Sequence, residues 1–311
     1  MIVLVCPGQG SQTPGFLSPW LELPGLRDQL TALSDAAGVD LVAHGTTSDE
    51  DTIKDTAVAQ PLLVGAGLLA LRALGGGTSS TDAVPESAVI AGHSVGEVTA
   101  AVGAGVLSEP DAMRFVALRG RAMAAASAAT PTGMSAVLGG DPDAVLASIG
   151  DHLLTPANVN GAGQVVAAGS LPALAELAAD PPPRARVIPL KVAGAFHTHY
   201  MEPAVEQLRA AATDLDVSDP GVTLVSNRDG QVVADGRQVL DRLVAQVSNP
   251  VRWDLCMERF AALGVTAVIE LPPAGTLVGL AKRALKGVEL LAVKTPDHLD
   301  AARTLLKEHS A

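Results

Sequence analysis

Ser94 is the residue whose surroundings most clearly predict chemistry, because it is the serine of a GHSVG pattern at 92–96. The pattern alone is weak evidence in a chain that contains 31 glycines. The apolar run 88–91 before it predicts a strand, however, and the Ala-rich run 97–107 after it predicts a helix. Between a strand and a helix, G-x-S-x-G forms a sharp turn that exposes the serine hydroxyl, and the first N–H groups of the helix face the group under attack. We therefore predict that Ser94 is a nucleophile.

His197 is the histidine best placed to act as the base for Ser94. It follows a strand predicted at 185–192 and precedes a helix predicted at 199–213. Loops after strand ends commonly hold catalytic groups in α/β proteins, although a structural histidine at a helix start is the alternative. His93 is expected to point away from the line of attack on Ser94. Four other histidines fall in polar loops or at helix ends: His44, His152, His298 and His309.

A carboxylate partner for this histidine is missing from the pattern. In ordinary α/β-hydrolases an Asp or Glu comes between the serine and the histidine in the chain, and the histidine lies near the C-terminus. Here no acid between Ser94 and His197 stands out at a strand end, and more than a hundred residues follow His197. The sequence therefore predicts that the protein is not an ordinary hydrolase.

A helix predicted over 109–129 carries Arg119 on its apolar face, in line with Phe115, Val116 and Met123 at steps of three and four residues. A guanidinium on a core-facing stripe costs several kcal/mol unless it meets an anion. Two partners are open at this point. One is an internal Asp or Glu, and the other is a substrate carboxylate, which a guanidinium can bind through two parallel hydrogen bonds.

An α/β fold must position these residues. The chain has 311 residues, 48% of them hydrophobic, which is enough to bury a large core. Strands alternate with helices before 130 and after 195, and this alternation predicts a mostly parallel sheet covered on both faces. Between 131 and 194 the order becomes β-α-β-β-α-β, which is typical of the ferredoxin-like unit. We therefore predict a large domain over 1–130 and 195–311, with a small subdomain inserted at 131–194.

The composition excludes several other classes of protein. A net charge of −12 and only 2% aromatic residues argue against nucleic-acid binding. Cys6 and Cys256 show neither disulfide nor metal-ligand spacing. The apolar start at 2–6 has no basic residue before it, so it predicts a strand and not a signal peptide. No run is expected to approach an uninterrupted membrane span of ~20 apolar residues. We therefore expect a cytoplasmic protein that binds neither nucleic acid nor membrane.

Six short motifs make the chain resemble the malonyl-CoA:acyl-carrier-protein transacylases, the acyltransferases of fatty-acid and polyketide synthesis, over essentially its whole length. The resemblance implies an α/β-hydrolase-like large domain with an inserted ferredoxin-like subdomain. It also implies ping-pong transfer of a malonyl group from malonyl-CoA to the phosphopantetheine thiol of acyl carrier protein, with no metal or redox cofactor. The motifs are PGQGSQ at 7–12, QPLL at 60–63, GHSVGE at 92–97, RGRAM at 119–123, GAFHT at 194–198 and NPVRW at 249–253.

The resemblance implies a catalytic role for five residues. Ser94 would carry the acyl group, and His197 would act as its base. The main-chain carbonyl of Gln246 would orient His197 in place of an acid, so the side chain of Gln246 would be dispensable. The main-chain N–H groups of Gln9 and Val95 would form the oxyanion hole.

The resemblance also implies the residues that bind substrate. Arg119 would bind the malonyl carboxylate, and Met123, Phe196 and Asn160 would complete the binding site. Related malonyl-selective domains often have His-Ala-Phe-His where this chain has GAFH at 194–197. Phe196 therefore favours malonyl over branched acyl groups, whereas Gly194 departs from the pattern.

Two other functions would use the same chain. A serine hydrolase or thioesterase would keep Ser94 and His197 and let water finish the reaction, whereas a non-catalytic scaffold would only dock the carrier protein. For the transferase the expected partners are malonyl-CoA and acyl carrier protein, and the expected state is a monomer. Carrier proteins of this kind are acidic, so a local basic patch must overcome the negative net charge. The candidates are Lys282 and Arg283 with Lys286, or Arg184 with Arg186.

Overall fold

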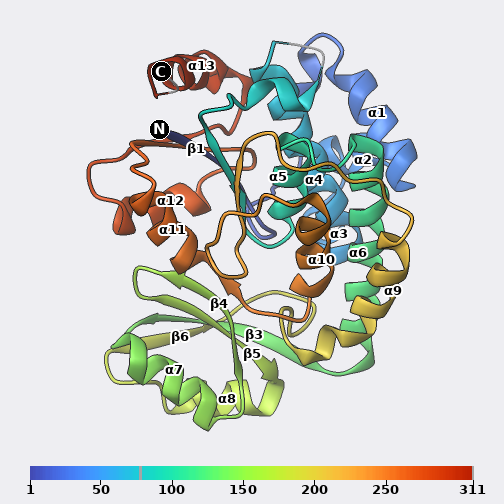
Figure 1. The fold of residues 1–311 in the computed structure, drawn as a ribbon. Helices are drawn as coiled ribbons and strands as arrows, with labels where there is room; N and C mark the ends of the chain where they lie inside the picture. Colours follow the sequence, from blue (N-terminus) through green and yellow to red (C-terminus); the bar gives the residue numbers. More distant parts are fainter. Residues whose placement is uncertain (77–78, 310–311) are drawn as a thin grey trace.

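The computed structural model describes residues 1–76 and 79–309. Figure 1 shows a large lobe, which holds both chain termini, and a small lobe at the end of the molecule away from them. The large lobe is built on a sheet with the strand order β10-β9-β1-β2-β7, in which every adjacent pair is parallel. The prediction of a mostly parallel sheet is confirmed. Its strands are β1 (Ile2–Cys6), β2 (Val89–Gly92), β7 (Thr223–Val225), β9 (Ala267–Glu270) and β10 (Glu289–Ala292).

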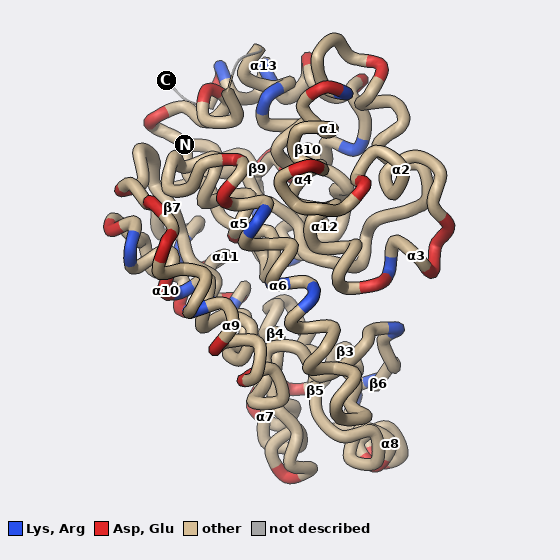
Figure 2. Tube along the Cα trace, turned by 90° about the vertical axis from the view of Figure 1, so that its right-hand side faces the viewer, with Lys and Arg blue, Asp and Glu red and all other residues tan. Residues whose placement is uncertain are grey.

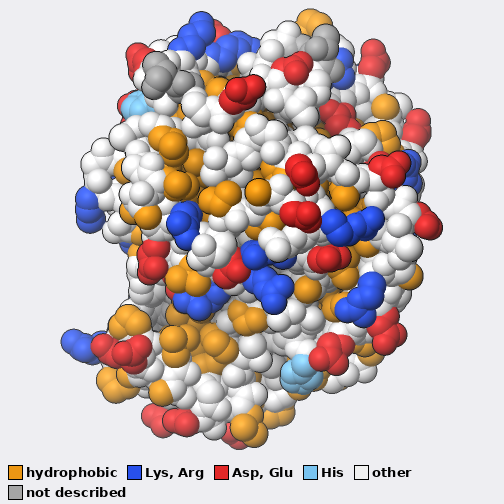
Figure 3. Space-filling view, in the orientation of Figure 1, with side chains coloured by type: hydrophobic (Ala, Val, Ile, Leu, Met, Phe, Trp, Pro, Cys, Tyr) orange, Lys and Arg blue, Asp and Glu red, His pale blue; other side chains and the backbone are white. Residues whose placement is uncertain are grey.

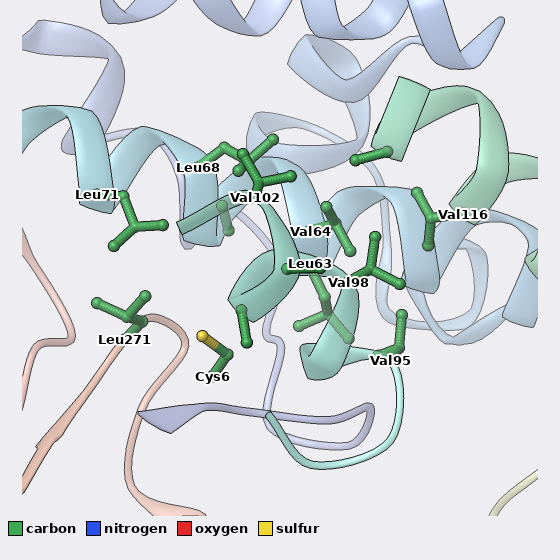
Figure 4. Close-up of a cluster of buried hydrophobic side chains, with 14 of the residues drawn as sticks. Cys6, Leu63, Val64, Leu68, Leu71, Val95, Val98, Val102, Val116 and Leu271 are labelled. Atoms are coloured by element: carbon green, nitrogen blue, oxygen red, sulfur yellow. The ribbon is translucent and has the colours of Figure 1, made fainter. Parts of the chain in front are cut away.

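Helices cover this sheet on both faces, because its strands carry apolar side chains on both. Along β1, Ile2, Leu4 and Cys6 join the core that α4, α5 and α6 complete, whereas Val3 and Val5 join the core that α11 and α12 complete. Figure 4 shows side chains of α4 and α5 meeting in the first of these cores. The helices of this lobe are α1 (Leu26–Ala37), α2 (Leu41–Thr46), α3 (Glu50–Lys54), α4 (Thr56–Leu74), α5 (Gly96–Gly103), α6 (Glu109–Ala129), α9 (Glu202–Ala212), α10 (Gly236–Gln246), α11 (Trp253–Ala262), α12 (Thr276–Ala284) and α13 (Leu299–His309).

Helix α4 is apolar on almost every side. Its 19 residues, Thr56–Leu74, have the length and the mean hydropathy of a membrane span. Its apolar residues are not an uninterrupted run, because Gln60 and Arg72 lie among them. The structure buries 78% of the apolar window inside the protein, between neighbours such as α5 and α6. A helix that is hydrophobic all round is explained by burial in the core of a large domain.

The small lobe is an antiparallel sheet with the strand order β6-β3-β5-β4, packed against α7 and α8. This arrangement is the ferredoxin-like unit that the sequence predicts, so the predicted fold class is confirmed. Figure 2 shows the same lobe from the side, as the narrower lower part of the molecule. Its elements all lie within 131–194, while the domain boundaries themselves stay a prediction: β3 (Thr132–Gly139), α7 (Pro142–Asp151), β4 (Thr155–Gly161), β5 (Gln164–Ser170), α8 (Leu171–Ala179) and β6 (Ala185–Pro189).

Two details of the small lobe differ from the sequence prediction. A fifth strand, β8 (Val251–Arg252), comes from the NPVRW motif and pairs in parallel with β4. Two residues are too short to give a periodic pattern, so the sequence could not reveal this strand, which joins the small sheet to the large lobe. The strand predicted at 185–192 ends at Pro189, and Leu190 and Val192 beyond it line the cavity between the two lobes.

Candidate active site

Ser94 lies in a sharp turn between β2 and α5, at the carboxyl end of the parallel sheet. Its φ is +52°, in the left-handed region that side chains other than glycine rarely adopt. A Cβ on Gly92 would lie 2.1 Å from the main chain of Gly96, and a Cβ on Gly96 would lie 2.1 Å from the carbonyl oxygen of Cys6. Both glycines of the pattern are therefore required by close approach of main-chain segments. The predicted strand–turn–helix elbow is present.

His197 reaches Ser94 from the loop that precedes α9. Its Nε2 lies 2.8 Å from Ser94 Oγ, and its Nδ1 lies 2.9 Å from the main-chain oxygen of Gln246. Since a carbonyl oxygen only accepts, Nδ1 carries the hydrogen and Nε2 presents a lone pair to the serine hydroxyl. The main-chain N–H of His197 donates to Val247 O at 2.9 Å, which holds this residue at a φ of +63°. The carbonyl stands where an ordinary hydrolase has a carboxylate.

The His197 imidazole is neutral at physiological pH. Burial, followed by the positive charge of Arg119, lowers its pKa from 6.5 to about 3, while the hydrogen bond to Gln246 O acts in the opposite direction. A neutral imidazole hydrogen-bonded to a serine hydroxyl can take up the serine proton. The pair therefore has the geometry and the protonation state of a nucleophile and its base.

The Ser–His pair opens onto a cavity of about 230 Å³ between the two lobes. Seven of the predicted site residues line it: Gln9, Ser94, Val95, Met123, Asn160, Phe196 and His197. Arg119 and Gln246 do not line it and lie behind its wall, in contact with Ser94 and His197. The described part of the chain, 1–76 and 79–309, contains no cluster of three or more His, Cys, Asp or Glu that could hold a metal ion.

Gln9 and Val95 line the same cavity as Ser94, in the loops that follow β1 and β2. Cys6 and Gly92 pair across these two strands, so both loops leave the sheet side by side. The side chain of Gln9 donates to Lys54 O at 3.2 Å, which fixes the first loop. Val95 precedes the first residue of α5, where main-chain N–H groups lack partners within the helix. The two main-chain amides can therefore face an oxyanion that forms at Ser94.

Arg119 is 1% exposed, and its guanidinium is held by two side-chain amides. Nη1 donates to Gln60 Oε1 at 2.6 Å, and Nη2 donates to Gln246 Oε1 at 2.7 Å and lies 3.5 Å from Ser94 Oγ. Among the described residues Arg119 has no ion pair, so an internal salt bridge is not its partner. Burial lowers its pKa to about 10, against the opposing effect of the Glu97 charge. The guanidinium is thus charged, buried and next to the nucleophile.

Residues 3–307 match the family model described as the acyl transferase domain. The chain belongs to the acyl transferase family. A relative from Mycobacterium tuberculosis named malonyl CoA-acyl carrier protein transacylase is 52% identical over 305 residues, which cover 98% of this chain and 100% of the relative. A crystal structure of MCAT from that species matches with a TM-score of 0.91 and 52% identity over 97% of this chain and 99% of that one. A malonyl-transacylase solved with a type II PKS acyl-carrier protein matches with a TM-score of 0.88 and 30% identity over 98% and 99%.

Gly194 is explained by packing in this acyltransferase. A Cβ on Gly194 would lie 2.6 Å from the Oγ of Ser127, on α6, and 3.2 Å from the Oγ1 of Thr132. Gly194 departs from the His-Ala-Phe-His pattern because Ser127 of α6 fills the space that a side chain at position 194 would need. Phe196, two residues on, keeps its place in the cavity wall.

The side chain of Gln246 does more than the resemblance implied. It is buried, and its Oε1 accepts from Arg119 while its Nε2 donates to Ser94 O at 3.0 Å and to Glu97 Oε2 at 2.5 Å. The expectation that this side chain is dispensable therefore does not fit the structure of the acyltransferase. The main-chain oxygen of Gln246 accepts from His197, and its side-chain amide hydrogen-bonds to both Arg119 and the main chain of Ser94 in the elbow.

Several residues of the acyltransferase site escaped the sequence analysis. Gln60 belongs to the QPLL motif, but nothing in the sequence linked it to Arg119. His93 lines the cavity, and its Nε2 lies 2.9 Å from Asn160 Oδ1, so it connects the elbow to β4 of the small lobe. Its ring packs edge-on against Trp253 with 5.6 Å between ring centroids. Helix α12 adds Thr276, Leu277 and Leu280 to the cavity wall.

Proposed function

We propose that this acyltransferase transfers a malonyl group from malonyl-CoA to the phosphopantetheine thiol of an acyl carrier protein, through a malonyl ester of Ser94. One observation supports this function above all: a buried guanidinium that has no ionic partner among the described residues lies 3.5 Å from the nucleophilic hydroxyl. A charge in this position favours an acyl group that brings its own carboxylate. The names of the relatives point to the same substrate and carrier.

In the first half of the proposed reaction Ser94 Oγ attacks the thioester carbonyl carbon while His197 Nε2 takes its proton. The oxyanion that forms accepts hydrogen bonds from the N–H groups of Gln9 and Val95, and each such donor stabilises a transition state by about 3–4 kcal/mol. The C–S bond then breaks, and the proton on His197 passes to the departing CoA sulfur. The product is a malonyl ester of Ser94.

In the second half the carrier thiol gives its proton to His197 and its sulfur attacks the ester carbonyl. The bond to Ser94 Oγ breaks, and Oγ recovers the proton from His197. The chemistry requires neither a metal nor a redox cofactor. A thioesterase would use water in place of the thiol, so the ratio of malonyl-carrier to free malonate distinguishes the two functions.

A local surface must receive the acidic carrier. Lys282, Arg283 and Lys286 are exposed at the end of α12, and the start of this same helix lines the cavity. Arg184 and Arg186 lie instead at β6, on the small lobe. Figure 3 shows basic and acidic side chains interspersed over the face it presents. The connection through α12 favours the first group as the docking site.

Intact-mass measurement after separate incubation with malonyl-, acetyl- and methylmalonyl-CoA tests the proposal. A stoichiometric malonyl adduct that disappears on addition of carrier protein, with malonyl-carrier as the product, supports it. Free malonate as the main product would identify a thioesterase, and no adduct would favour a docking scaffold.

We further propose that the enzyme is a monomer and that it acts in the cytoplasm. The proposed reaction serves both fatty-acid and polyketide synthesis.

A further inference from the structure

Glu97 is a buried carboxylate to which neither the Ser–His chemistry nor substrate binding assigns a role. It is the last residue of the GHSVGE motif, lies in the first turn of α5 and is 7% exposed. Its Oε1 accepts from the main-chain N–H of Asn227 at 2.6 Å, and its Oε2 accepts from Gln246 Nε2 at 2.5 Å. Burial raises the pKa of Glu97, and the hydrogen bonds that both oxygens receive act against this effect by favouring the ionised carboxylate.

The Gln246 amide connects Glu97 to Arg119, and it has only one orientation that satisfies both. A carboxylate only accepts hydrogen bonds, and a guanidinium only donates them. Gln246 must therefore turn Nε2 toward Glu97 and Oε1 toward Arg119, as the structure shows. Since the main-chain N–H of Asn227 fixes the other oxygen of Glu97, the carboxylate sets the direction of the amide together with Ser94 O, which accepts from the same Nε2.

This arrangement gives Arg119 a nearby negative charge without a direct ion pair. The charge of Glu97 opposes the effect of burial on the pKa of Arg119, so it favours the charged guanidinium. A carboxylate in direct contact would compete with a substrate carboxylate for the same N–H groups. With Gln246 between them, Arg119 gives one N–H to Gln60 and one to Gln246 and keeps others for substrate.

We propose that Glu97 is a positioning residue that holds Arg119, through the Gln246 amide, in the orientation that selects carboxylate-bearing acyl groups. This inference rests on the proposed malonyl transfer. The competing explanation is purely structural: Glu97 would only stabilise the start of α5 and the Asn227 segment. In that case its loss would lower stability and would reduce the transfer of every acyl group alike.

Glu97→Gln tests the two explanations, because it keeps the shape and removes the charge. The amide of the new glutamine has one oxygen, whereas two donors face it, the main-chain N–H of Asn227 and Gln246 Nε2. One of these donors must therefore face an N–H group of the new side chain. The main chain at Asn227 is fixed, so the Gln246 amide either turns, with its N–H groups toward Arg119 and its oxygen against Ser94 O, or keeps its direction and faces an N–H group of residue 97. In both cases the hydrogen bond that holds the amide against Arg119 is lost. We expect kcat/KM for malonyl transfer to fall about 30-fold, as for loss of a hydrogen bond to a charged group, and acetyl transfer to change less than about threefold.

Glu270→Gln is the matched control. Glu270 is 0% exposed and accepts from the main-chain N–H groups of Gly275, Leu277 and Val278, but it does not touch Arg119 or Gln246. It should lower Tm and leave the malonyl-to-acetyl ratio unchanged. Should Glu97→Gln fail to fold, Glu97→Asp keeps the charge and shortens the reach, and the ratio is expected to fall at least about fivefold.

A double-mutant cycle with Arg119→Ala completes the experiment. If Glu97 acts through Arg119, Glu97→Gln should not change the ratio further in the Arg119→Ala background. An unchanged ratio in the folded single variants, or equal loss of malonyl and acetyl transfer, would overturn the proposal. If the wild-type enzyme forms no malonyl-carrier, the proposed function itself fails, so the two failures are distinguishable.

Discussion

Replacement of Arg119 by alanine is the sharpest test of how this site chooses its acyl group. The variant removes a buried guanidinium that lies 3.5 Å from Ser94 Oγ and leaves the Oε1 atoms of Gln60 and Gln246 without their donor. Malonyl carries a carboxylate that this guanidinium can bind through two hydrogen bonds, whereas acetyl carries none. The two acyl groups should therefore respond differently to the same substitution.

The size of the effect follows from those two hydrogen bonds. Each hydrogen bond to a charged group contributes about 1.5–3 kcal/mol, so loss of two costs about 3–6 kcal/mol, or roughly 10²- to 10⁴-fold in kcat/KM for malonyl. Acetyl transfer should hold or rise, because the enzyme no longer leaves a buried charge unpaired when acetyl binds. Arg119→Lys should recover little, because an ammonium cannot reproduce the planar fork that spans Gln60, Gln246 and a carboxylate.

Steady-state transfer of malonyl and acetyl groups to carrier protein, with Tm measured for each variant, checks this prediction. Arg114→Ala is the matched control, since Arg114 lies on the same helix and pairs with Asp111 on the surface. It should leave both rates and the malonyl-to-acetyl ratio unchanged. Equal loss of malonyl and acetyl transfer in Arg119→Ala, together with a lower Tm, would refute the reasoning and make Arg119 a structural residue.

Three further predictions concern the catalytic pair and its support. Ser94→Ala should show no malonyl adduct by intact mass, and an adduct of unchanged yield would place the nucleophile elsewhere. Gln246→Ala should keep the carbonyl that holds His197 yet lose at least about tenfold in malonyl transfer, since Arg119 and Ser94 O lose a partner each; full activity would show that the side chain is dispensable. Because the pKa of His197 is lowered from 6.5 to about 3, kcat/KM should show no acid limb near 6.5. Arg119→Ala should raise the pKa of His197 and so move the acid limb to higher pH, which the pH profile for acetyl transfer will show. An acid limb at 6.5 in the wild-type enzyme would contradict the lowered pKa.

The depressed pKa of His197 also has a consequence for stability. The unfolded chain takes up a proton at this residue near its ordinary pKa of 6.5, whereas the folded enzyme does so only near 3. Folding is therefore favoured by this group above about pH 6.5, and that contribution is lost progressively as the pH falls from there toward about 3. The free energy of unfolding should decline as the pH is lowered from about 6.5 toward about 3. His197→Gln should make this decline shallower.

The sequence predicts what local patterns determine. The elbow at Ser94 needs two glycines, a strand before it and a helix after it, and all of these are adjacent in the chain. The buried position of Arg119 follows from helical spacing, since Phe115, Val116 and Met123 on the same stripe are also buried. The ferredoxin-like order is likewise read from one continuous segment.

What the sequence could not predict depends on contacts between distant segments. The side chain of Gln246 meets Arg119, Glu97 and Ser94 across separations of 127, 149 and 152 residues. No local spacing reports such contacts, and a glutamine near the end of a helix is most simply explained as surface. The contact of His93 is unpredictable for a related reason: its partner Asn160 lies on the other lobe, so the geometry of the elbow predicts only that His93 points away from the line of attack on Ser94.

Two features that the sequence presents separately, the missing acid and the buried arginine, have one physical explanation. A carboxylate on His197 Nδ1 would raise the pKa of this imidazole and would also attract the guanidinium that lies 3.5 Å from Ser94 Oγ. The neutral carbonyl of Gln246 orients the ring without adding charge, so burial, and after it the charge of Arg119, keeps the pKa of the base low and the imidazole unprotonated. Glu97 supplies the negative charge that a buried guanidinium needs, but from behind the Gln246 amide. Arg119 therefore stays charged and available for a substrate carboxylate, and His197 stays neutral and able to accept the proton of Ser94.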